Sequence, residues 1–490
     1  MKILLASSEL HPYSKTGGLA DMAGALARSL SAAGHRVGVV TPLYKGIQET
    51  HPALKKVDLP LDLPLGPDRV TADVWILEPE PNLTIYFIDQ PAFYQRSALY
   101  QEGGKDYPDN AARFIFFSKA VTYLAKNLSW RPEVVHVHDW QAALVPLLLS
   151  HQKLVEGWDA MPRTCLTIHN LAYQGVFPAA DYALANLPPD YFNLNGVEFY
   201  GKMNCLKAGI AYADVLTTVS PRYAREITTP ESGCGLDGLL RKREGVLFGI
   251  LNGVDYEEWN TTDNPYLECP YSIRNLTGKR RNKSALQAEL GLPVAPECPL
   301  FGTISRLTEQ KGLDIQIGAL EEMLGANMQF VLLGNGSPAF EKAYRDLVRR
   351  HPAKAAAQIG FDTKLSHRIE AACDFYVMPS RFEPCGLNQM YSLRYGTIPI
   401  VRITGGLDDT VVDISEDQDR ANGIKFAEYS ARALAKSIRK ALVLYGEPRL
   451  LRHYQENAMS ADFSWDRAVE RYVEVYDAGR PSSITIARKR

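Results

Sequence analysis

Ile3-Leu4-Leu5-Ala6-Ser7-Ser8, followed closely by Lys15-Thr16-Gly17-Gly18-Leu19, is the stretch from which the fold can be predicted. The first run is short and mostly apolar, which is typical of a buried strand, and a helical pattern begins near Ala20. Two adjacent glycines allow a sharp turn and a close approach of backbone N–H groups to a ligand, and the helix start is electropositive. Because Lys15 adds a full charge, we expect an anion cradle here, although an ordinary strand-to-helix turn has a similar pattern.

The same rhythm of short apolar runs and longer helical patterns continues along the chain. Strands are expected at 36–41, 133–138, 164–168 and 215–219, and again at 300–305, 329–333, 375–379 and 397–402. Nearly continuous apolar runs suit parallel strands that are buried on both faces. Two such series predict an α/β protein with two doubly wound, Rossmann-like domains that face each other across a deep cleft.

The expected domains are residues 1–250 and 256–462, with a hinge near Gly249–Asp255, where a strand-like run ends in an Asn-Gly turn signal. Polar stretches at 261–265 and 277–283 follow the hinge. Residues 465–476 have apolar side chains at helical spacing. We expect a C-terminal helix, within about 463–490, that packs on a domain surface, and a return to the first domain is one arrangement open to it.

The composition excludes several classes of protein. The 490 residues are 46% hydrophobic and 22% charged, with a formal net charge of -2. This profile indicates a folded globular protein and gives no basic tract for nucleic acid. The seven cysteines are scattered without a Cys-x-x-Cys pair, which argues against a disulfide framework or a zinc site. Without a signal peptide or a membrane-spanning run, the expected location is the cytoplasm.

Two loops of the second half carry charges at strand ends. Arg306 and Lys311 follow the first strand of that half, where open α/β sheets bind ligands, and their charges suit a pyrophosphate. Glu383 precedes a glycine and a helix expected at 387–395, whose first N–H groups could meet a second phosphate. A solvated loop and a helix-capping charge are the plainer interpretations of these residues.

Two segments of the first half carry polar residues where their strands end. His136 and His138 lie two apart on one strand, so they share a face, and His138-Asp139 and His169 stand where strands end. A metal site is one interpretation, but no cysteine or carboxylate set completes it. We expect instead that His138, Asp139 and His169 line a polar cleft.

Seven segments together resemble bacterial glycogen synthase and plant starch synthase, glycosyltransferase family 5. They are Lys15–Asp21, His138–Trp140, Thr167–Gly175, Asn252–Asp255, Ser305–Gly312, Glu383–Leu387 and Thr404–Leu407. The resemblance extends over essentially the whole chain in the order of the family. It implies the GT-B architecture and transfer of glucose from ADP-glucose to the non-reducing end of an α-1,4-glucan with retention of configuration. It implies neither a metal ion nor pyridoxal phosphate.

Site residues follow from this resemblance position by position. It makes Lys15, Arg306 and Lys311 the ligands of the donor diphosphate, places Glu383 beside the transferred glucose and puts His169 near the reacting carbon. Other donor-cleft positions are Gly17, Gly18, Asp21, Asp139, Asn252, Cys385, Gly386 and Leu387. The wider two-domain pattern has a second glutamate eight residues after the first, but Tyr391 stands there. Arg402 is left out because the paired arginines expected beside it are absent.

The mechanism and the donor remain open at this stage. Residues 167–175, expected to cover the β-face of the sugar, contain no carboxylate nucleophile, which favours front-face attack with the leaving diphosphate as proton acceptor. A synthase that prefers UDP-glucose, a non-catalytic glucan or nucleotide-sugar sensor, and a phosphorylase that uses pyridoxal phosphate are the alternatives.

Overall fold

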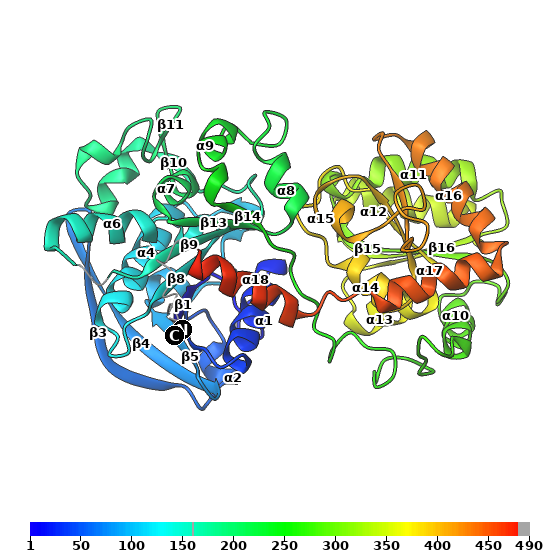
Figure 1. Cartoon of the computed structure of the whole chain (residues 1–490), viewed down its shortest axis with the longest axis horizontal. Helices are drawn as coiled ribbons and strands as arrows, with labels where there is room; N and C mark the ends of the chain where they lie inside the picture. Colours follow the sequence, from blue (N-terminus) through cyan, green and yellow to red (C-terminus); the bar gives the residue numbers. More distant parts are fainter. Residues whose placement is uncertain (159–160, 479–490) are drawn as a thin grey trace, which may run out of the picture. The chain divides into compact units, whose positions relative to one another are not determined.

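The computed structural model describes residues 1–158 and 161–478, which form two α/β units (Figure 1). Among the described residues, unit 1 comprises 1–219, 224–253 and 465–478, and unit 2 comprises 220–223 and 254–464. One detail differs from the expected division, because Ser220–Tyr223 group with unit 2. The C-terminal helix starts at Trp465, within the expected segment. Residues 479–490 of the expected C-terminal segment lie outside the described residues.

Unit 1 is built on a nine-stranded sheet in the order β14-β13-β9-β8-β1-β2-β5-β4-β3. Neighbouring strands from β14 to β5 run parallel, and β3 and β4 extend the sheet in antiparallel fashion. The parallel strands are β1 (Lys2–Ala6), β2 (Arg36–Pro42), β5 (Leu83–Asp89), β8 (Val134–His138), β9 (Arg163–Ile168), β13 (Val215–Thr218) and β14 (Leu247–Gly249). The extension consists of β3 (Lys55–Leu65) and β4 (Asp68–Glu80).

Helices, a small three-stranded sheet and the two-stranded pair β6 (Gln101–Glu102) and β7 (Lys105–Asp106) complete unit 1. The small sheet pairs β10 (Val176–Pro178), β12 (Lys202–Asn204) and β11 (Glu198–Phe199). The helices are α1 (Gly18–Ala32), α2 (Ile47–Thr50), α3 (Pro91–Tyr94), α4 (Asn110–Asn127), α5 (Asp139–Ala142), α6 (Val145–Glu156), α7 (Cys205–Tyr212), α8 (Pro221–Glu226, which begins in unit 2), α9 (Asp237–Lys242) and α18 (Trp465–Asp477). The last helix, red in Figure 1, packs against α1 and buries Tyr472 and Tyr476.

Unit 2 is a six-stranded parallel sheet in the order β17-β16-β15-β18-β19-β20. Its strands are β15 (Leu300–Leu307), β16 (Gln329–Gly336), β17 (Ala355–Ile359), β18 (Phe375–Met378), β19 (Ile398–Arg402) and β20 (Ile424–Phe426). Its helices are α10 (Thr277–Glu289), α11 (Leu313–Met323), α12 (Pro338–Arg350), α13 (Thr363–Ala372), α14 (Asn388–Arg394), α15 (Gly405–Thr410), α16 (Ala431–Tyr445) and α17 (Pro448–Ser460). The polar stretch 277–283 is therefore the first half of a helix.

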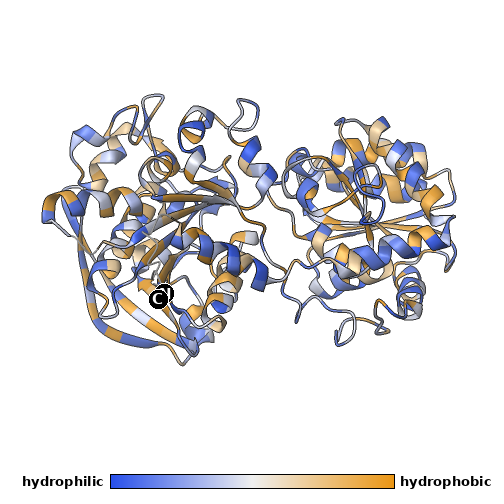
Figure 2. Ribbon diagram, in the orientation of Figure 1, coloured by the Kyte–Doolittle hydropathy of each residue, from blue (hydrophilic) through white to orange (hydrophobic). Residues whose placement is uncertain are grey.

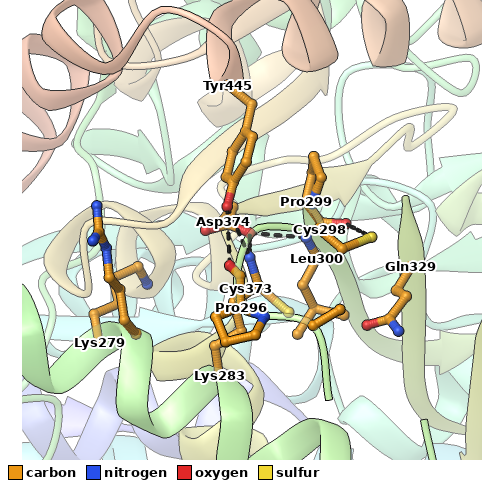
Figure 3. A network of polar contacts seen from close by, with 12 residues as sticks. Lys279, Lys283, Pro296, Cys298, Pro299, Leu300, Gln329, Cys373, Asp374 and Tyr445 are labelled. Carbon is orange, nitrogen blue, oxygen red and sulfur yellow. Dashed lines mark hydrogen bonds and ion pairs between the residues drawn. The ribbon is translucent and has the colours of Figure 1, made fainter. Parts of the chain in front are cut away.

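Hydrophobic residues concentrate on the central strands of both sheets (Figure 2). One buried ionic cluster interrupts this pattern in unit 2, where Lys283 of α10 and Tyr445 of α16 point toward Asp374 (Figure 3). Lys283 Nζ lies 2.6 Å from Asp374 Oδ2 and 3.1 Å from the Tyr445 hydroxyl. Asp374 Oδ2 also accepts the backbone N–H of Leu300, so the cluster ties α10 and α16 to the start of β15. No helix within the described ranges is long and apolar enough to cross a bilayer.

Candidate functional site

The glycine loop of unit 1 leads from β1 into α1. Lys15 Nζ donates to Asp21 Oδ1 at 2.7 Å, and both side chains are partly exposed. The loop does not use its glycines for the expected sharp turn, because Gly17 is extended (φ -159°) and Gly18 is the first residue of α1. A Cβ atom at either position would meet nothing within 4 Å. The glycines therefore keep one side of the helix start bare, so that a ligand can approach the backbone closely.

Glu9 is a residue of this loop that the sequence analysis missed. Its buried carboxylate accepts the backbone N–H of Thr16 at 2.5 Å and that of Gly17 at 3.2 Å, as well as the Thr16 and Tyr100 hydroxyls. Two of the N–H groups expected to cradle an anion are thus bound to the protein's own carboxylate. The cationic group here is Lys15, which is paired with Asp21 and lies next to the N-terminus of α1. An isolated acid after a strand gives no sequence signal for such a role.

A histidine pair ends two neighbouring strands of unit 1, β8 and β9. His138 Nδ1 lies 3.2 Å from His169 Nε2, and Asp139 Oδ1 accepts the backbone N–H of His169 at 2.8 Å. Burial lowers the pKa of His169 to about 3, so the ring is neutral at neutral pH. Burial also raises the pKa of Asp139 to about 7, although backbone N–H groups partly stabilise its charge. The structure therefore brings these three residues together as expected.

His136 belongs to the core and not to this pair. Its ring lies 4.2 Å from that of His138, on the same face of β8. Its two nitrogens are 2.7 Å from the Tyr476 hydroxyl and 2.6 Å from Thr167 Oγ1. Within 1–158 and 161–478, no group of three or more His, Cys, Asp or Glu side chains is arranged to hold a metal ion.

In unit 2, three loops meet at the carboxyl edge of the sheet. Lys311 Nζ lies 2.7 Å from Glu383 Oε2, which also accepts the Ser380 hydroxyl at 2.9 Å. The Glu383 side chain is only 8% exposed, so its charge is held by this ion pair within the protein. Arg306, near the end of β15, is exposed. Of the two candidate diphosphate ligands here, Lys311 is therefore paired and Arg306 is open to solvent.

Close backbone packing explains why glycine occupies two positions in these loops. Gly312 has a φ of +70°, and a Cβ atom there would lie 2.0 Å from the Pro379 carbonyl oxygen. Gly405 has a φ of +43°, and its Cβ would lie 1.9 Å from the Glu383 carbonyl oxygen. Any side chain would push the loops apart, so glycine at these two positions lets 305–312, 380–387 and 404–407 pack around Glu383.

The segment after Glu383 is also constrained. Cys385 is buried, Gly386 has a φ of +74°, and Leu387 precedes α14, which starts one residue later than expected. Gln389 donates to the carbonyl groups of Cys385 and Gly386. The side-chain amide of Gln389 therefore holds both carbonyl groups, which fixes the conformation of the loop.

Tyr391 stands where the wider pattern has a second glutamate, and it is used in packing. Its ring stacks on Trp259 at 3.7 Å with an interplanar angle of 5°, and His367 stacks on Trp259 at 4.1 Å.

Arg402, left out of the site, donates to the Ser380 carbonyl and so supports the loop that holds Glu383. Asn252, the remaining candidate, is buried in the connection that ends unit 1.

Phe361 is a second residue that sequence reasoning passed over. It follows β17 and Gly360, and 85% of it is exposed. A large apolar ring so open to water, at the strand edge where α/β sheets bind ligands, is a candidate platform for a planar group. A single phenylalanine in a loop gives no signal in the sequence.

The comparisons agree along the whole chain. Residues 2–242 match the family model described as starch synthase catalytic domain, and residues 292–460 match that of glycosyl transferases group 1. Glycogen synthase from Anaeromyxobacter sp. (strain Fw109-5) is 48% identical over 477 residues, which cover 97% of this chain and 99% of the relative. The chain belongs to the glycogen and starch synthase family.

Other members of the family agree with this assignment. Glycogen synthase from Thioalkalivibrio sulfidiphilus is 45% identical over 97% of this chain and 99% of that relative. The catalytic domain of starch synthase IV from Arabidopsis thaliana, solved with ADP and acarbose, has a TM-score of 0.86 and 32% identity, and the match covers 97% of this chain and 98% of that one. The fold is therefore the two-domain GT-B architecture of that family.

Proposed function

We propose that this member of the family transfers glucose from ADP-glucose to the non-reducing end of an α-1,4-glucan and retains the anomeric configuration. The observation that carries the proposal is the Lys311–Glu383 ion pair, which holds one cation and one anion within loops that also present Arg306. A nucleotide-sugar donor needs both charges, because its leaving group becomes negative while the sugar becomes positive.

The proposed reaction divides these tasks among the residues. Lys311 and Arg306 stabilise the departing diphosphate, and Lys15 supplies a third cation from unit 1. Glu383 stabilises the positive charge that develops on the glucose ring. The segment 167–175 offers the neutral His169 and no carboxylate, so it provides no carboxylate nucleophile for a glycosyl-enzyme intermediate. The acceptor hydroxyl then attacks on the face that the diphosphate leaves, and the diphosphate takes the proton.

Two observations support an adenine nucleotide. The exposed ring of Phe361 can stack on a planar base, and a purine gives more stacking area than a pyrimidine. The similar Arabidopsis starch synthase was solved with ADP. Phe361→Ala should therefore raise KM for ADP-glucose and leave kcat within a few-fold, whereas the same change at the exposed Leu450 should alter neither.

The deciding experiment is a transfer assay with radiolabelled ADP-glucose or UDP-glucose and a short maltooligosaccharide. We expect chain elongation with ADP-glucose at a higher kcat/KM, and products whose new bonds an α-specific glucosidase cleaves. Binding of donor without transfer would favour the sensor alternative. Preference for UDP-glucose would overturn the donor assignment alone.

Metal independence is part of the proposal. Lys15, Arg306 and Lys311 together supply the charge that a divalent cation gives to many nucleotide-sugar transferases. Full activity is therefore expected after exhaustive treatment with EDTA. Activity that is lost on chelation and returns with Mg²⁺ or Mn²⁺ would contradict this part.

A further inference from the structure

We propose that His138 is a positioning residue that fixes His169 as the tautomer with its proton on Nδ1. His169 then meets the sugar as a hydrogen-bond donor and not as a base. The role in transfer rests on the proposed function, whereas the tautomer is a property of unit 1 alone.

The inference begins with an unpaired atom. His138 is fully buried, and its Nε2 has no hydrogen-bond partner among the described residues. Its other nitrogen, Nδ1, faces His169 Nε2 at 3.2 Å. Burial holds the pKa of His138 well below its usual value, and the neighbouring histidines lower it further, so only one of its nitrogens carries a proton.

Two arrangements are compatible with this geometry. In the first, the proton of His138 is on Nδ1 and is donated to His169 Nε2, so an unprotonated Nε2 of His138 is left unpaired. In the second, the proton is on Nε2, which leaves a buried N–H without an acceptor. Orphaned buried N–H groups are rarer in proteins than under-satisfied acceptors. The first arrangement is therefore favoured.

The consequence for His169 follows from proton counting. Its Nε2 accepts a hydrogen bond and carries no proton, and the ring is neutral. Its single proton must then be on Nδ1, for which the described residues provide no partner. His169 as a residue is only partly buried, which is compatible with contact between this N–H and a sugar hydroxyl oxygen. Because His169 offers a donor here, it cannot accept the proton of the acceptor hydroxyl, which leaves that task to the diphosphate.

The backbone prepares this contact. Asp139 has a φ of +55°, in the left-handed region, and its carboxylate fixes the N–H of His169. Asparagine and aspartate tolerate that region better than most residues. The position of the His169 backbone is thus set by Asp139, and the protonation of its ring by His138.

The test is the tautomer of His169 in the full chain, labelled with ¹⁵N-histidine and observed by long-range ¹H–¹⁵N correlation. Loss of one signal set in His169→Gln assigns the ring. We expect a protonated Nδ1 and an unprotonated Nε2. A protonated Nε2 in the wild-type protein would overturn the proposal, whether or not the protein transfers glucose.

Variants connect the tautomer to the rate. His138→Leu removes the donor, so His169 should populate both tautomers and kcat should fall on the order of tenfold to a hundredfold with little change in donor KM. His138→Asn, which places an amide N–H near the lost Nδ1, should restore most of both properties.

The matched control is His136→Gln, two residues earlier on β8 and equally buried. It has no hydrogen bond to His169 and should reduce stability without changing kcat or the tautomer. A kcat loss of the same size in His136→Gln and His138→Leu, with the His169 tautomer unchanged, would show that His138 acts only through packing.

Discussion

Glu383 keeps a negative charge in a fixed position inside the protein. Its carboxylate is almost excluded from water and is paired with Lys311 and the Ser380 hydroxyl. Burying a charge is costly unless it is paired and hydrogen-bonded, and these partners meet that condition. The same contacts keep the carboxylate in one place, so it can stabilise a developing positive charge without first being reorganised.

Glu383→Gln should therefore lower kcat by roughly a hundredfold or more, because the neutral amide cannot stabilise a cationic sugar. A 2-fluoro-glucose donor, which slows the breakdown of any glycosyl-enzyme, allows the role to be checked by intact-protein mass spectrometry. We expect no adduct on the wild-type protein. A glucosyl adduct mapped to Glu383 would show that it is a nucleophile.

At the scale of the elements, the buried ion pair between Lys283 of α10 and Asp374 at the start of β18 is important for stability. Lys283→Met should cost about 3–5 kcal/mol in the free energy of unfolding of unit 2, because it leaves Asp374 buried without its cation. Denaturant titration of the full chain measures this. Lys342→Ala, which breaks an ion pair whose lysine is 77% exposed, is the control and should change stability by at most about 0.5 kcal/mol.

The double variant Lys283→Met/Asp374→Leu separates charge from packing. It removes both members of the pair and should regain part of the stability lost in the single variant. No recovery would mean that Lys283 acts through its aliphatic stem and its contact with Tyr445.

The helix α13 carries a second buried acid, Glu370, whose pKa burial raises to about 8. The folded state therefore keeps a proton that the unfolded chain releases near pH 4.5, and stability falls as the pH rises between these values. The slope is at most about 1.4 kcal/mol per pH unit. Glu370→Gln does not titrate and should lose this slope, so its stability relative to wild type grows from pH 5 to pH 8.

Urea titrations at pH 5, 6, 7 and 8 test this expectation. Glu322→Gln, an exposed change on α11, serves as the control and should keep the wild-type slope. Parallel curves for the wild type and Glu370→Gln would contradict the assignment.

The parts of the fold that sequence predicts are those in which one local pattern has one interpretation. Continuous apolar runs gave β1, β2, β8, β9 and, in unit 2, β15, β16, β18 and β19 to within a few residues, whereas β17 and β20 were not predicted. The long β3 and β4 were missed because they alternate between buried and exposed positions, and much of β3 is polar. The first half of α10 looked like a polar linker because its buried lysines, Lys279 and Lys283, have their partners far away in sequence.

The same rule applies to the candidate site. His138, Asp139 and His169 could be grouped from sequence, because the ends of adjacent parallel strands meet at one edge. Lys311 and Glu383 could be grouped for the same reason. Glu9 and Phe361 could not, because their roles depend on which loop folds over the carboxylate and on how open the ring is to water.

At the scale of the whole molecule, unit 1 is discontinuous. It is completed by α18, whose Tyr476 hydroxyl bonds His136 beneath the histidine pair. A chain that ends at Ser464 should therefore lack a stable unit 1, because it leaves His136 Nδ1 without its Tyr476 partner and uncovers the apolar surface that α18 buries. Hydrogen exchange should show protection lost in unit 1 and kept in unit 2.

The full chain with Arg467→Ala and Glu470→Ala, two exposed positions of α18, is the control and should keep the wild-type protection. Unchanged protection of β8 and β9 in the chain that ends at Ser464 would show that α18 is dispensable for unit 1.

The position of α18 also sets the order in which a nascent chain can finish folding. Nearly all of unit 1 leaves the ribosome first, but its last helix emerges only after the roughly 210 residues of unit 2 have been translated. At about 5–20 residues per second, this delay is about 10 to 40 s. During that time the surface of unit 1 that α18 covers is open to water and to other chains. A chain released before α18 is translated therefore exposes an apolar surface that chaperones and proteases can recognise. A chain that stops before α18 therefore cannot complete unit 1.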